Sequence, residues 1–65
     1  MILSAPMRST AIADVEYDTE ERTLEVTFAS GRSYTHVGVP QTTYEALVNA
    51  GSPGSYYNSH IKGAF

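Results

Sequence analysis

The fold is decided by the stretch 23–37, which reads TLEVTFASGRSYTHV. Its first six residues alternate strictly between polar and apolar side chains, a pattern typical of a strand with one buried face. The apolar positions are Leu24, Val26 and Phe28. We therefore predict a strand over residues 23–28 whose apolar face lies on the hydrophobic core.

The turn that follows decides which face the next strand, over residues 32–37, presents to the core. A two-residue loop would place Tyr34 and His36 on the polar face of the sheet. A three-residue loop with Gly31 in the left-handed conformation would instead pair them with the buried face. We favour the three-residue loop because its last position requires glycine, and because an outward Tyr34 would leave the core poorly covered.

On the N-terminal side, residues 10–17 predict a further strand, but Ile12 and Val15 have the wrong spacing to share one face. A β-bulge near residues 13–14 would bring both side chains to the core. The polar run 18–22 predicts the turn that joins the two strands. Residues 1–7 show no periodicity, and we expect them to form a flexible tail.

On the C-terminal side, the sequence predicts two short helices. The first begins at Pro40 and ends at Gly51, and the second is capped by Ser52, with Pro53 at its first position. Apolar side chains recur at helical spacing in the first at Tyr44, Leu47 and Val48, and in the second at Tyr57, Ile61 and Phe65. We therefore predict one α+β domain over residues 8–65: a three-stranded antiparallel meander followed by two helices packed on the sheet.

The charge of the 65-residue chain is uneven. Seven Asp and Glu against four Lys and Arg give a net charge of −3, yet residues 1–25 carry six of the acids and two Arg, whereas residues 26–65 carry one acid and two cations. A phosphate-bearing ligand would have to use the C-terminal part. The 42% apolar content argues against disorder, and the absence of Cys excludes disulfides, thiol catalysis and Cys-based zinc sites.

Little in the sequence points to catalysis or to a membrane. His36 and His60 are the only imidazoles, and neither has an acid or a second metal ligand at suitable local spacing. We therefore expect a protein that is not an enzyme, with no metal and no cofactor. No run approaches the ~20 apolar residues of a membrane helix, and the first residues do not resemble a signal peptide, so we expect a cytoplasmic location.

The second predicted helix offers the best candidate binding surface. Its first turn exposes backbone N–H groups and carries no side chain at Gly54, and a polar stripe on its wet side includes an amide and a cation. An exposed tyrosine provides a further contact residue. The candidate binding residues are Ser52, Gly54, Tyr56, Asn58 and Lys62.

Several of these residues carry a resemblance to a known family. The sequence has Val39-Pro40 followed by Tyr44, and then Ala-x-Ser-x-Gly-x-x-Tyr-Asn-x-x-Ile-Lys from Ala50 to Lys62. From residue 8 to residue 65 it closely resembles the KTSC domain, named for its occurrence at the C-terminus of some lysyl-tRNA synthetases and also found as short free-standing bacterial and phage proteins. The resemblance implies no catalytic residue, and its link to tRNA-charging enzymes implies an association with RNA.

We therefore expect a non-catalytic binding module whose partner is a nucleic acid, contacted through the second helix. The alternative is a protein-interaction or self-association module that uses Tyr56 and Phe65 as exposed apolar contacts. For the isolated chain we expect a monomer or a weak homodimer.

Overall fold

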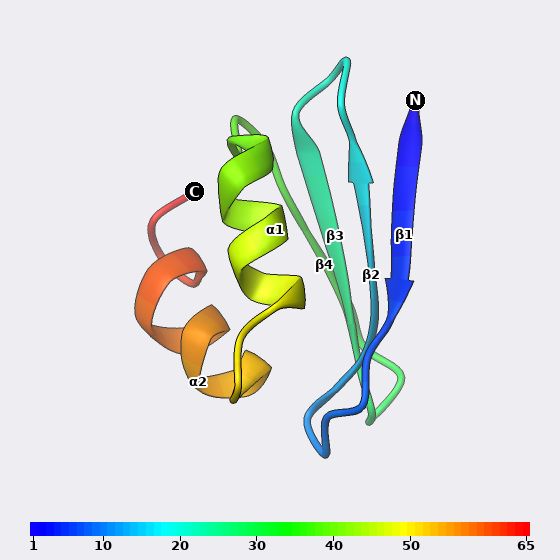
Figure 1. Ribbon diagram of the computed structural model, residues 1–65, viewed down its shortest axis with the longest axis vertical. Coiled ribbons are helices and arrows are strands. Elements are labelled where there is room, and N and C mark those ends of the chain that lie inside the picture. The colour runs from blue at the N-terminus through cyan, green and yellow to red at the C-terminus, as the bar shows by residue number, and fades with distance from the viewer.

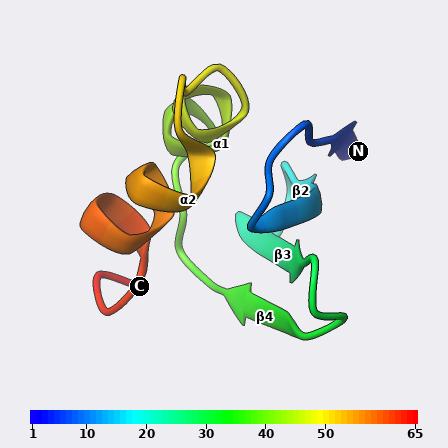
Figure 2. The same ribbon diagram turned by 90° about the horizontal axis from the view of Figure 1, so that it is seen from below.

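The computed structural model describes residues 1–65 and has two layers, a four-stranded sheet and a helical layer that covers one of its faces (Figures 1 and 2). The sheet is antiparallel with the strand order β1-β2-β3-β4. The strands are β1 (Ile2–Pro6), β2 (Ile12–Asp18), β3 (Thr23–Phe28) and β4 (Ser33–His36). The α+β class is therefore confirmed, but the sheet has four strands where three were expected.

The additional strand is β1, which lies where the sequence analysis expected a flexible tail. Leu3 pairs with Tyr17 and Ala5 pairs with Val15, so both are half-buried against the core while their neighbours are exposed. The hydrogen bonds from Thr19 N to Met1 O and from Met7 N to Ala13 O enclose this ladder. The strand escaped prediction because its partner residues lie far along the chain and because Pro6 suggested a loop. In an edge strand proline is tolerated, since one set of backbone groups faces away from the ladder.

The two local irregularities of the sheet match the predictions. The register between β2 and β3 shifts between Ile12 and Asp14, so the predicted bulge is confirmed, and Ile12 and Val15 are both fully buried. In the β3–β4 hairpin, Val26 pairs with Tyr34 and Leu24 pairs with His36, as the three-residue loop requires. Gly31 has a φ of 97°, a conformation that glycine adopts without strain.

The helical layer consists of α1 (Gln41–Val48), α2 (Pro53–Tyr56) and a π-helical turn, η1 (Tyr57–Ile61), that continues α2. Pro40 directly precedes α1, and Ser52 and Pro53 occupy the predicted first positions of α2, although the Ser52 hydroxyl makes no capping hydrogen bond. The helix α1 ends at Val48, before the predicted Gly51. The expected apolar stripe also stops early, because η1 ends at Ile61 and leaves Phe65 43% exposed.

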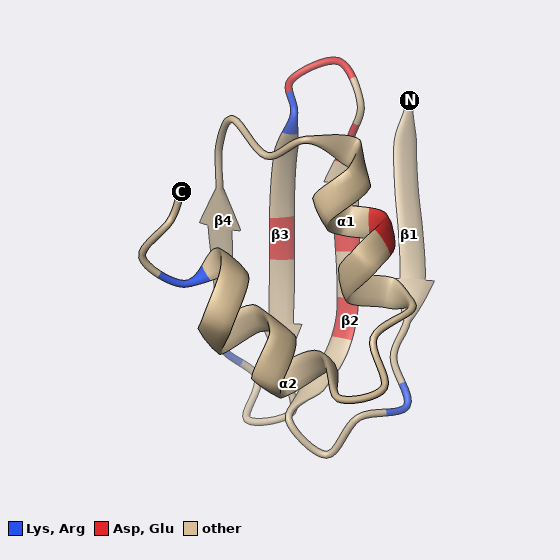
Figure 3. Ribbon diagram, turned by 60° about the vertical axis from the view of Figure 1, so that its left-hand side comes forward, with Lys and Arg blue, Asp and Glu red and all other residues tan.

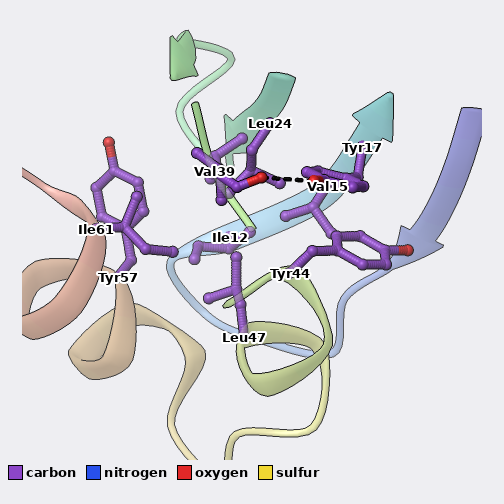
Figure 4. Close-up of a cluster of buried hydrophobic side chains, with 10 residues drawn as sticks. Ile12, Val15, Tyr17, Leu24, Val39, Tyr44, Leu47, Tyr57 and Ile61 are labelled. Carbon is purple, nitrogen blue, oxygen red and sulfur yellow. Dashed lines mark hydrogen bonds between the residues drawn. The ribbon is translucent and has the colours of Figure 1, made fainter. Parts of the chain in front are cut away.

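The core lies between the two layers and is built from ten buried side chains (Figure 4). They are Ile12, Val15, Tyr17, Leu24, Val26, Val39, Tyr44, Leu47, Tyr57 and Ile61. No polar or charged residue is buried among them. The hydroxyl of Tyr17 donates a hydrogen bond to the carbonyl oxygen of Val39, which joins β2 to the segment before α1.

Candidate functional site

One groove of about 620 Å³ opens beside the helical layer, where three separate segments of the chain meet. The β3–β4 hairpin forms one wall, the C-terminal helical segment forms another, and the loop between β1 and β2 closes one end. The lining residues are Thr10, Ala11, Phe28, Ala29, Ser30, Arg32, Tyr34, His36, Tyr57, Asn58 and Lys62. We refer to this feature as the groove.

Strand alternation explains how β4 and Arg32, the residue directly before it, supply three of these side chains. Successive side chains of a strand point to opposite faces, so Arg32, Tyr34 and His36 share the face that the helices cover. The three-residue loop selects this face, because Tyr34 and His36 are then opposite the buried Val26 and Leu24. Since β4 is an edge strand, the covering helices leave this end of the face partly open, and Tyr34 remains 46% exposed.

Aromatic rings form the floor of the groove. The ring of Phe28 packs edge to face with Tyr34 at 5.6 Å between centroids and with Tyr57 at 5.1 Å. The Nε2 atom of His36 lies 2.8 Å from the hydroxyl of Tyr57 and is hydrogen bonded to it. Burial raises the pKa of the Tyr57 phenol above its usual value, and the nearby Tyr34 adds to this rise. Tyr57 is therefore a neutral, fixed hydroxyl on this floor at ordinary pH.

The C-terminal segment places a polar side chain and a cation on the rim. The backbone N–H of Lys62 donates to the carbonyl oxygen of Tyr57 at 2.9 Å, which is the five-residue spacing of a π-turn. Tyr57 and Ile61 face the core, whereas Asn58 and Lys62 are exposed and line the groove. Neither the Asn58 amide nor the Lys62 amine has a hydrogen-bond or ion-pair partner within the protein.

The groove is positive although the chain is acidic. Its lining includes Arg32 and Lys62 and no Asp or Glu, and the protein's one ion pair joins the amino terminus to Glu20 at 3.9 Å. Both groove cations are therefore unpaired. Figure 3 shows the acidic residues on β2, β3, α1 and the turn between β2 and β3, away from β4 and the C-terminal helices. A second, smaller hollow lies on the uncovered face of the sheet and contains Glu16, Asp18, Glu21 and Glu25.

The structure separates the five candidate residues into two groups. Asn58 and Lys62 line the groove, whereas Ser52, Gly54 and Tyr56 do not. Gly54 has a packing role, because a Cβ atom at this position would lie 3.2 Å from the Cβ of Ala11. Tyr56 is half-buried, and its ring stacks on His60 at 4.4 Å with an interplanar angle of 10°.

The sequence analysis missed Arg32, Tyr34 and His36 as site residues. The sequence did contain an indication, because the predicted three-residue loop already placed alternate side chains of residues 32–37 on one face of the sheet. The missing information was the position of the C-terminal helix, which turns this face into the wall of a groove.

The side chains of the groove offer several contacts for a bound ligand. His36 is paired with a phenol, so its ring is oriented by a neutral hydroxyl and not by a carboxylate. No three His, Cys, Asp or Glu side chains gather where they could hold a metal ion. None of the helices combines the length and apolar character needed to cross a membrane. The arrangement provides two cations, one free amide and exposed aromatic surface.

Comparisons with known proteins agree on one family. Residues 8–65 match the KTSC domain. An uncharacterised protein of Stutzerimonas stutzeri is 36% identical over 56 residues, which cover 86% of this chain and 79% of that protein. A lysine–tRNA ligase of Trichormus variabilis is 41% identical over 54 residues, which cover 83% of this chain but only 10% of the ligase.

A solved structure shows the same fold. The crystal structure of a KTSC domain protein from Yersinia pestis superposes with a TM-score of 0.92 at 31% sequence identity, covering 100% of this chain and 92% of that one. The sequence match spans nearly the whole chain, and the structural match includes all of it. The chain therefore belongs to the KTSC domain family.

Proposed function

We propose that this KTSC domain is a non-catalytic module that binds nucleic acid in the groove. The observation that carries the proposal is the pair of unpaired cations, Arg32 and Lys62, in a groove that has aromatic side chains and no carboxylate. Phosphate groups favour such cations, and bases favour aromatic rings.

The relatives support a nucleic acid over other anions. The lysine–tRNA ligase of Trichormus variabilis contains a segment that is 41% identical to this chain, and that of Nostoc punctiforme contains one that is 39% identical. Both enzymes are named for tRNA, and the segment makes up 10% of each of them. A small domain attached to such an enzyme suits an accessory role in holding RNA.

The net charge of −3 does not oppose this proposal, because the acids of the sheet point the other way. Asp14 and Glu16 alternate with buried Val15 and Tyr17, and Glu25 alternates with its buried neighbours, so these carboxylates lie on the uncovered face of the sheet. The groove is on the opposite face. A bound phosphate would therefore have the sheet between it and these acids.

The test is fluorescence anisotropy with a labelled single-stranded RNA of mixed sequence, titrated at several salt concentrations. Each phosphate contact with a single strand contributes about −0.7 to the slope of the logarithm of the binding constant against the logarithm of the salt concentration. Two contacts therefore predict a slope of about −1.4. The double variant R32Q/K62Q should bind much more weakly and lose this slope. The double variant R8Q/R22Q is the matched control, because it changes the net charge equally at cations that do not line the groove.

Two results would contradict the proposal. One is equal weakening by the two double variants, which would mean that overall charge and not the groove determines binding. The other is an RNA affinity that does not change with salt, since phosphate contacts release counterions when they form.

A further inference from the structure

We infer that the groove accepts an unpaired nucleotide, with its base against the ring of Tyr34 and its phosphate between Arg32 and Lys62. This inference rests on the proposed function and narrows it to single-stranded nucleic acid. The three side chains line the same groove, which contains no carboxylate.

Tyr34 is the aromatic ring that is free to stack. Tyr57 is 5% exposed and Phe28 is half-buried, whereas Tyr34 is 46% exposed. Its edge-to-face contact with Phe28, at 5.6 Å between centroids and 79° between ring planes, packs the ring against the floor of the groove. A fixed ring at the surface of a positive groove is the usual platform for an unstacked base.

The shape of the site favours a single strand over a duplex. Its volume of about 620 Å³ is in the range of small-molecule sites, which is enough for one base and its phosphates. A duplex hides the faces of its bases by stacking. Proteins commonly contact a duplex with an element that projects into the major groove of the nucleic acid and with many phosphate contacts. Here the surface is concave and has only two cations, which does not suit a duplex. Stacking on Tyr34 also requires an exposed base face, and only unpaired nucleotides provide one.

Asn58 is placed to contact the edge of the base. Its amide carries both donors and an acceptor, is exposed on the rim of the groove, and has no partner in the protein. By contrast, the Asn49 amide donates to the carbonyl oxygen of Glu45 at 2.9 Å and is occupied. Asn58 is therefore the side chain that would distinguish one base from another.

The experiment compares three ligands with the full chain: a labelled single-stranded RNA, a blunt duplex of the same sequence, and inorganic polyphosphate as a competitor without bases. We expect the single strand to bind at least about tenfold more tightly than the duplex, and polyphosphate to compete poorly. Y34L, which keeps an apolar side chain but removes the ring, should weaken single-strand binding about tenfold. Y34F, which keeps the ring, should bind like the wild type.

The outcomes separate this inference from the proposed function. If the duplex or polyphosphate binds as well as the single strand while R32Q/K62Q is still weakened, the groove reads charge alone and the inference is wrong, but the proposed function stands. If no RNA binds, both fall, and a protein partner becomes the next subject of study. The ligand comparison uses the wild-type chain, so it decides the inference even if Y34L does not fold.

Discussion

The substitution Tyr17→Phe removes a single oxygen atom, yet it should strongly lower the free energy of unfolding of the domain. Tyr17 is 1% exposed, and its hydroxyl donates to the carbonyl oxygen of Val39, a residue that is itself fully buried. The N–H of Val39 is bonded separately to the carbonyl oxygen of Arg22 at 2.9 Å. These two bonds hold the segment before α1 against β2 and the β2–β3 turn.

The expected magnitude follows from what the substitution leaves behind. The phenylalanine ring would keep the stacking on Tyr44, with centroids 5.4 Å apart, so the loss of packing is small. The Val39 carbonyl oxygen, however, would lose its hydrogen-bond donor in a site closed to water, which costs about 1–3 kcal/mol. A domain of this size has a total stability of about 3–10 kcal/mol. The melting temperature should fall by about 4–8 °C for each kcal/mol lost.

Urea unfolding followed by circular dichroism measures this loss, and Tyr44→Phe provides the control. The Tyr44 hydroxyl has no hydrogen-bond partner within the protein and points away from the core in Figure 4, so its removal should change the free energy of unfolding by less than about 0.5 kcal/mol. If both variants unfold at the same urea concentration with an unchanged slope, the buried bond to Val39 does not contribute as argued.

Two further predictions concern the turn and the phenols. Arg22 has a φ of 55°, which is unfavourable for a residue with a side chain, so Arg22→Gly should raise the free energy of unfolding by up to about 1 kcal/mol, and a lower melting temperature would contradict this. Burial raises the pKa of Tyr57 and of Tyr44 above the usual 10.0, with smaller contributions from Tyr34 and Glu45. The unfolded chain therefore loses these protons first, so stability should be complete below about pH 10 and should fall above it. Urea midpoints measured across this range test the fall, which should be shallower in Tyr57→Phe.

The sheet shows which parts of a fold a sequence can specify. The β3–β4 hairpin and the bulge in β2 were predictable because each depends on a few neighbouring residues: the position of Gly31 sets the register, and the spacing of Ile12 and Val15 requires an extra residue. The strand β1 was not predictable in this way. Only Leu3 and Ala5 face the core, and their burial depends on pairing with residues fourteen and ten positions away.

The candidate site follows the same division. Asn58 and Lys62 were identifiable because they lie on the polar stripe of one helix. Arg32 and the rings of β4 become part of a site only when the hairpin and the C-terminal helix meet, which is a tertiary arrangement. In the first turn of α2, Gly54 allows the close approach of Ala11, which is a packing role that the sequence did not indicate. Binding at this turn stays a prediction.

Strand alternation also explains how an acidic chain can have a groove lined by cations and by no carboxylate. Because successive side chains point to opposite faces, acids at every second position of β2 gather on the uncovered face, where Glu16 is directly opposite Glu25. Like charges paired in this way reduce stability, so their placement has a cost. The sheet separates them from the groove, whose lining contains no carboxylate, and salt screens the remaining interaction between exposed charges. The affinity of the groove for an anion should therefore depend on Arg32 and Lys62, and not on the net charge of the chain.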